Sequence, residues 1–249
     1  MVLSPIQIVN GCFSLVFVII AVIISLLFLL KYRQYKSKII LLFGIVLLLL
    51  ISSWYASSSS FLIAIFINET GYMTTPQIYF AIGFIPLPIA AYIWSNIFTN
   101  LVYQEKRKIF TTFFIIMGII VEIIFIIFLG INPQLIGQVI SPIDADYNLL
   151  ITLYQFFLVI YMLVTGILFG LASIRDDNPE IRLKSKLLII AFVSFVIGAV
   201  LEILSGISLL IMIIARLILI SSSIEFYGGF MLPTWMKKLF LKKDKKPIL

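Results

Sequence analysis

The chain lacks histidine entirely and contains a single cysteine, Cys12. Without histidine it cannot by itself build a His-ligated zinc or haem site or a Ser-His-Asp triad, and one cysteine cannot form an internal disulfide. Charged residues are also scarce, at 12% of the chain against about 25% in soluble domains. We therefore expect no metal site, no haem and no histidine-based catalysis.

What the chain has instead is apolar residues, which make up 62% of its 249 positions. A soluble fold could not bury so much apolar surface, whereas a bilayer can. The first residues carry no basic segment, and the first apolar run is longer than a signal-peptide core, so we interpret it as a retained helix. The composition predicts an all-α integral membrane protein, in contact with membrane lipids, in the cell membrane.

Apolar runs that reach the roughly 20 residues of a transmembrane helix predict the spans. The stretch 187–232 would extend roughly 69 Å as one helix, more than twice the hydrocarbon core, so we expect a hairpin that turns at 205–208. Asn178 and Pro179 are typical of a helix start just before the sixth span. The expected spans are 6–30, 39–67, 77–102, 109–129, 149–172, 187–204 and 209–232, which place a seven-helix domain at 1–236.

Basic residues set the expected orientation. Of the 18 Lys and Arg, all but Arg216 fall in segments 31–38, 106–108, 175–186 and 237–246. Seven spans bring these segments to one side of the membrane, and the intervening loops carry no basic residue. Because basic loops stay in the cytoplasm, we expect the N-terminus outside and a basic cytoplasmic tail at 237–249.

The net charge of +7 has the same origin, and basic residues beside a membrane indicate topology and anionic lipids rather than nucleic acid. We therefore expect no nucleic-acid partner. The tail is expected to anchor on the inner leaflet, or to dock a cytoplasmic signalling partner.

Four ionisable residues lie inside the predicted spans, where charge is costly and often functional. Arg216 cannot lose its charge, and depth along the helices leaves Glu122 and Glu202 as candidate partners. Glu225, nine residues after Arg216, lies on the opposite face of the same helix and predicts an inner polar cluster with Ser221.

Other features of the spans point to packing or to a polar site. Ser53, Ser57 and Ser60 share one helix face and indicate close packing or the lining of a pocket. Pro86 and Pro88 predict a kink. The residues expected to form a ligand site or buried polar cluster are Glu122, Glu202, Arg216, Ser53, Ser57, Trp94 and Asn96.

Gly166 and Gly170 form a GxxxG pattern, which indicates close contact between helices. The contact is expected either within the bundle or in a homodimer.

Seven helices with an outside N-terminus share the layout of rhodopsins and G-protein-coupled receptors. The last span has no lysine before Lys237 to form a retinal Schiff base, so no retinal is expected, and receptor-type DRY and NPxxY patterns are absent. Segments 180–188, 216–219 and 225–235 resemble archaeal seven-helix membrane proteins of unassigned function, and through them the membrane sensor region of archaeal histidine kinases. This resemblance implies the fold and a sensory role, and it brings no catalytic residues.

These observations lead to a sensor or receptor-like protein that signals through a cytoplasmic partner. A small transporter or channel that uses the intramembrane Glu and Arg residues is the first alternative, and a structural subunit of a membrane complex is the second. An enzyme is not expected, since no paired carboxylates occur in a span.

Overall fold

The computed structural model describes residues 3–203 and 208–241. The expected turn at 205–208, except Ser208, and most of the expected tail at 237–249 lie outside the described residues. The helices are α1 (Pro5–Tyr35), α2 (Lys38–Leu50), α3 (Ser52–Phe66), α4 (Pro76–Phe84), α5 (Pro86–Val102), α6 (Arg107–Ile131), α7 (Leu149–Leu171), α8 (Pro179–Ile203), α9 (Leu209–Met231) and α10 (Thr234–Phe240). Two 3-10 turns, η1 (Gln104–Lys106) and η2 (Pro133–Leu135), and two strands, β1 (Gly137–Ser141) and β2 (Asp144–Tyr147), complete the described elements.

Six helical segments of the described chain are long and apolar enough to cross a membrane: α1, α4 with α5, η1 with α6, α7, α8 and α9. The pair α2 and α3 passes the same test, although it is bent by 51°, and would be a seventh span if it crosses as one. Residues such as Ile116, Ile119 and Ile123 of α6 are more than half exposed on the bundle surface. Such a surface suits lipid rather than water.

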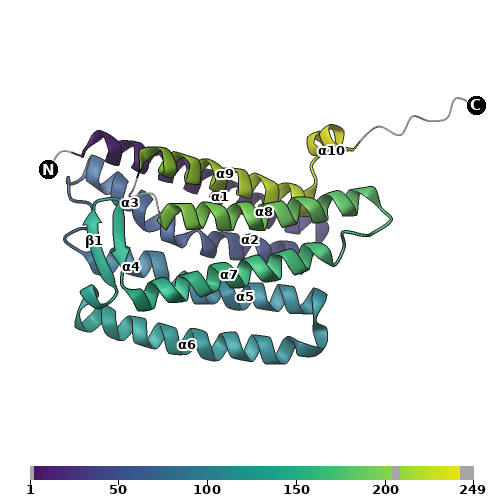
Figure 1. Ribbon diagram of the computed structural model, residues 1–249, viewed down its shortest axis with the longest axis horizontal. Helices are drawn as coiled ribbons and strands as arrows, with labels where there is room; N and C mark the ends of the chain where they lie inside the picture. The colour runs from purple at the N-terminus through teal and green to yellow at the C-terminus, as the bar shows by residue number, and fades with distance from the viewer. Residues whose placement is uncertain (1–2, 204–207, 242–249) are drawn as a thin grey trace, which may run out of the picture.

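The helices run back and forth between two ends of an elongated bundle (Figure 1). One end, here called the hairpin end, carries the β1–β2 hairpin and the start of α1. At the other end, here called the basic end, lie the end of α1, the connections α5–α6 and α7–α8, and α10. The segments rich in Lys and Arg thus gather at one end of the molecule, as the alternation of the spans predicts.

Local sequence explains where several helices begin. Ser4 and Gln7 form a reciprocal capping box at the start of α1, and Pro5 occupies the first helical position. At α8 the Asn178 side chain accepts a hydrogen bond from the Glu180 amide at 2.9 Å. The predicted start of the sixth helix is therefore confirmed.

The span expected at 39–67 is not one straight helix, because it bends at Ile51 between α2 and α3. The hydroxyls of Ser52 and Ser53 donate to the Gly83 carbonyl at 3.0 and 3.3 Å. Gly83 lies in the last turn of α4, where carbonyls lack intrahelical partners, and Pro86 interrupts the helix after Ile85 as expected. The serine hydroxyls at the bend between α2 and α3 thus donate hydrogen bonds to a carbonyl that the break between α4 and α5 leaves without a helical partner.

The stretch between α6 and α7, expected only as a polar connection, contains an antiparallel hairpin. Gly137 pairs with Tyr147 and Val139 with Ala145, and the register shifts before Ser141. Ile136 and Ile143 at the ends of the hairpin are almost fully buried. In residues 3–203 and 208–241 the fold is therefore all-helical except for this small hairpin, which packs onto the bundle.

The GxxxG glycines lie against α8 of the same chain. A methyl group at Gly166 would overlap the Phe192 ring, and one at Gly170 would overlap Ile189. Both glycines are buried. The close contact that the motif predicts is therefore made within the bundle, and this face is not free for the homodimer that was the alternative.

Candidate functional site

A cavity of about 520 Å³ opens at the hairpin end, between α3, α4, α7, α8, α9 and the hairpin. Its volume lies in the range of small-molecule sites, about 300–1,000 Å³. Most of its wall is apolar, and its polar or charged residues converge from several elements. These residues are Ser53, Ser57, Tyr79, Asp144, Asp146, Tyr147, Thr152, Gln155, Glu202 and Arg216.

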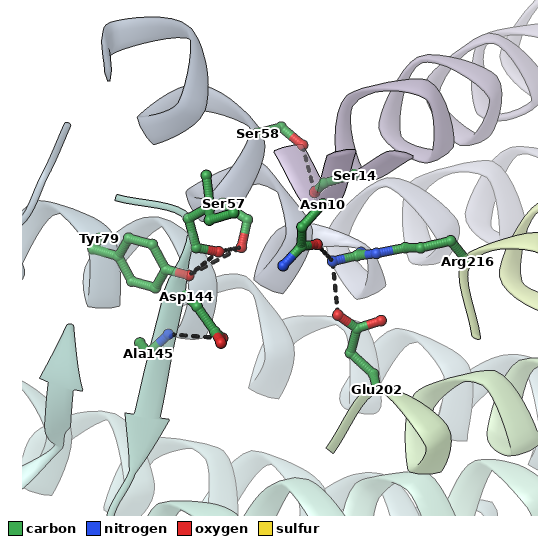
Figure 2. Close-up of polar contacts among 10 residues, drawn as sticks. Asn10, Ser14, Ser57, Ser58, Tyr79, Asp144, Ala145, Glu202 and Arg216 are labelled. Atoms are coloured by element: carbon green, nitrogen blue, oxygen red, sulfur yellow. Dashed lines mark hydrogen bonds and ion pairs between the residues drawn. The ribbon is translucent and has the colours of Figure 1, made fainter. Parts of the chain in front are cut away.

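Arg216, which projects from α9 into the cavity wall, is only 2% exposed. Its Nη2 lies 2.7 Å from Oε1 of Glu202, at the end of α8. Nη2 also donates to Oδ1 of Asn10 in α1 at 3.3 Å (Figure 2). The predicted ion pair of Arg216 is confirmed, with Glu202 as its partner. Asn10 was not foreseen, although it is a rare amide within the first apolar run.

Two nitrogens of the Arg216 guanidinium, Nε and Nη1, are buried and make no hydrogen bond within the described residues. Because five N–H groups of an arginine require acceptors, the ion pair leaves part of this donor capacity unused. An acceptor atom placed in the cavity beside Arg216 would complete it.

Asp144 supplies a second carboxylate from the first residue of β2. Its Oδ1 accepts a hydrogen bond from the Ala145 amide at 3.0 Å, and Figure 2 shows its side chain pointing towards the Arg216–Glu202 pair. Burial raises the pKa of Asp144, as does nearby Asp146, while the Ala145 amide and Arg216 act in the opposite direction. Sequence reasoning missed Asp144. The available signal was two aspartates in a connection without a single basic residue.

The hairpin is fixed above the cavity by two side chains from the helices below. Ser57 donates to the Ile143 carbonyl at 2.8 Å, and its hydroxyl also lies 3.0 Å from the Tyr79 hydroxyl. Ser58, one residue along α3, is bonded instead to Ser14 of α1 at 2.9 Å. The serine-rich stretch therefore both packs helices together and lines the cavity, with Ser53 and Ser57 in both roles.

Comparison with protein-family models, with curated proteins and with solved structures finds no match to this chain. The resemblance to archaeal seven-helix proteins accordingly remains a prediction from the segments that carry it. The chemistry of the site has to be inferred from the cavity itself.

Glu122 does not join this cavity. It lies on α6 beside an open depression of about 340 Å³ that Pro88 and Tyr92 also line, and neither carboxylate oxygen makes a hydrogen bond within the described residues. In Figure 1, α6 and α9 lie at opposite sides of the bundle. Depth along the membrane normal made Glu122 a candidate partner for Arg216, but depth does not specify position around the bundle.

Trp94 and Asn96 also lie outside the cavity, contrary to expectation. Trp94 is fully buried, donates its indole N–H to Thr165 at 2.8 Å, and packs against Phe192 in the aromatic core. Asn96 is half-buried on the same helix. The polar cluster predicted from sequence thus divides, and only Ser53, Ser57, Glu202 and Arg216 share the cavity.

The expected inner polar cluster forms further along α9. Ser221 donates to Oε1 of Glu225 at 2.7 Å, one helical turn away. Beyond it, α10 is tied to the start of α8 by an ion pair of 2.6 Å between Lys237 and Glu180. Polar contacts of α9 therefore occur at the cavity and further along the helix, and the ion pair near the basic end joins α10 to α8.

Proposed function

We propose that this protein is a seven-span sensor of the cell membrane, with its hairpin end outside and its basic end in the cytoplasm. In this proposal a ligand binds the cavity at the hairpin end, and the basic end passes the signal to a cytoplasmic partner. The observation that carries the proposal is the ion pair in the cavity wall between the buried Arg216 and the partly exposed Glu202. Ionisable groups are costly within a bilayer and mark functional sites there.

The route from cavity to basic end runs along α9 and its neighbour α8. A methyl group at Gly198 would crowd Leu219, and one at Gly229 would crowd Leu188. Helices packed this closely at both ends move together or slide past each other. A shift of Arg216 relative to Glu202 would thus change the geometry of the Lys237–Glu180 ion pair.

A continuous transport path receives less support. Between the cavity and the basic end, the core is filled by buried aromatic side chains such as Phe43, Phe192 and Phe226. Their rings pack on one another at centroid distances of 4.8–5.3 Å. A binding site that ends on a packed core favours sensing over transport.

The proposal is tested by measuring whether the cavity controls the basic end. Spin labels are placed by Asp176→Cys and Lys238→Cys in a Cys12→Ser background, in the full chain reconstituted into nanodiscs, and their distance distribution is measured. We expect Arg216→Gln and Glu202→Gln each to change the distribution, whereas Arg107→Gln, an exposed arginine outside the cavity, leaves it unchanged. A distribution that neither cavity variant alters would contradict the sensor.

A second measurement separates sensing from transport. The protein is placed in liposomes with a trapped pH dye, and proton flux is followed under an imposed gradient. We expect no flux above that of empty liposomes. Steady flux that Glu202→Gln abolishes would refute the sensor and support the transporter alternative.

A further inference from the structure

The charges that line the cavity do not balance. Three carboxyl groups, those of Asp144, Asp146 and Glu202, line it against the single guanidinium of Arg216. Arg216 already pairs with Glu202 at 2.7 Å, and within the described residues no ion pair joins Asp144 to a basic side chain. The cavity therefore favours a ligand with a positive charge placed near Asp144.

A second feature calls for a hydrogen-bond acceptor on the same ligand. The buried Nε and Nη1 of Arg216 have no hydrogen bond within the described residues, and Arg216 faces Asp144 across the cavity (Figure 2). A ligand that carries both a cationic group and a hydroxyl or carbonyl oxygen could pair with Asp144 and also bond to Arg216, since both residues line the cavity.

The rest of the cavity suits an apolar chain. Leu87, Leu158 and Met162 are buried residues of its wall. The lining continues to Phe156 of α7 and Val200 of α8, which are 47% and 37% exposed on the bundle surface. In a bilayer this surface faces lipid, so a ligand can enter from the membrane between the outer parts of these helices.

We propose that the cavity binds an amine-bearing amphiphile. Its ammonium group pairs with Asp144, an oxygen acceptor bonds to Arg216, and its apolar chain lies along α7 and α8 towards the lipid. This inference rests on the proposed function, since it names the ligand class that the sensor would detect.

Trp54, which lines the cavity, provides a direct reporter. Trp94→Phe and Trp235→Phe leave it as the sole tryptophan in the full chain, which is reconstituted into nanodiscs. Its fluorescence is titrated at neutral pH with four probes that share a similar apolar chain: octylamine, 1-amino-2-octanol, octanol and octanoate. We expect both amines to bind at least about tenfold more tightly than octanol or octanoate. The amino alcohol should bind about threefold more tightly than octylamine, because its oxygen reaches Arg216.

Two aspartates of the same strand provide the matched variants. Asp144→Asn should weaken octylamine binding by about tenfold. Asp146→Asn removes the same charge two residues away, but its exposed side chain is screened by water, so it should weaken binding by less than about threefold. Circular dichroism of each variant confirms that it is folded.

Three results would overturn the inference: octanoate binding more tightly than the amines, octylamine binding no better than octanol, or equal effects of the two asparagine variants. A failure of every probe to alter Trp54 fluorescence would also refute it. None of these results decides the proposed function, because the spin-label measurement uses no ligand and tests the coupling of the cavity to the basic end by itself.

Discussion

At the scale of single residues, the cost of burying Arg216 dominates the site. A guanidinium that is 2% exposed remains charged and must be compensated where it lies. Glu202 provides the opposite charge and Asn10 one further acceptor. Removal of one partner of a buried ion pair typically costs about 3–5 kcal/mol, because the other charge is left uncompensated.

Replacement of the two intramembrane glutamates should therefore affect stability differently. Glu202→Gln is expected to lower the free energy of unfolding by about 3 kcal/mol. Glu122→Gln removes a carboxylate with no hydrogen bond within the described residues and should leave stability unchanged or slightly higher. Unfolding in mixed micelles of increasing SDS content, followed by circular dichroism, measures both. Equal losses of unfolding free energy in the two variants would show that Glu122 has a partner that stabilises the fold as much as Arg216 does.

Asp144 predicts a pH dependence of stability. Because burial raises its pKa above the ordinary range, the folded protein holds this proton more tightly than the unfolded chain. Its contribution to stability is thus greatest below the unfolded pKa and is lost as pH rises through the folded pKa. The charged or titratable groups near it are Asp146, Tyr147, Tyr79, Glu202 and Arg216.

We expect Asp144→Asn to be more stable than the unmodified protein at neutral pH, and this difference to shrink as the pH falls through that window. Unfolding curves collected across the pH range for both proteins measure it, with Asp146→Asn as the control. A constant difference at every pH would contradict the assignment.

The sequence was informative about residues that can be buried in only a few ways. A charged Arg216 inside a span required a partner, and one of two candidates was correct. Sequence could not choose between them, because depth fixes one coordinate and helix packing fixes the other two. Asp144 and Gln155 were missed because a polar residue in a connection or an isolated amide in a span has many ordinary explanations.

At the scale of elements, small residues and hydroxyls determine how the helices meet. Gly166 and Gly170 allow α7 to approach α8, and Ser52 and Ser53 bond to the Gly83 carbonyl at a helix end. The proline break was predictable because proline removes a backbone donor. The bend at Ile51 was not predictable, because neither proline nor glycine marks it. The Gly83 carbonyl that accepts a hydrogen bond from Ser52 at this bend lies 31 residues further along the chain.

Two glycines provide a matched test of this packing. Gly166→Ala places a methyl group in the Phe192 ring and should lower the free energy of unfolding by about 2 kcal/mol, a typical cost of overpacking. A methyl group at Gly130 of α6 meets no atom of the described structure within 4 Å. Gly130→Ala should therefore be neutral or slightly stabilising, because alanine favours helix. Thermal unfolding of both variants compares them, and similar losses would indicate that helix propensity rather than contact governs both sites.

At the scale of the whole molecule, the path of the chain brings the basic segments together. The basic segments lie at one end of the bundle and the hairpin with its aspartates lies at the other (Figure 1). Alternation of apolar runs and basic loops sufficed to predict this arrangement, since both follow from the bilayer. The hairpin and the cavity beneath it depend on contacts between distant segments, such as Ser57 with Ile143, and no local pattern encodes them.

The bent pair α2–α3 decides the number of crossings. If it spans the membrane, Lys36 before α2 and Thr74 after α3 lie on opposite sides; if it re-enters, they lie on the same side. We expect Thr74→Cys, in a Cys12→Ser background, to react with an impermeant maleimide in intact cells, and Lys36→Cys to react only after lysis. The exposed position of both residues makes labelling a measure of sidedness rather than burial. Protection of both variants until lysis would instead reduce the spans to six and place the C-terminus outside, on the same side as the N-terminus. The basic end would then no longer lie wholly in the cytoplasm, and the direction of signalling proposed for α9 would lose its basis.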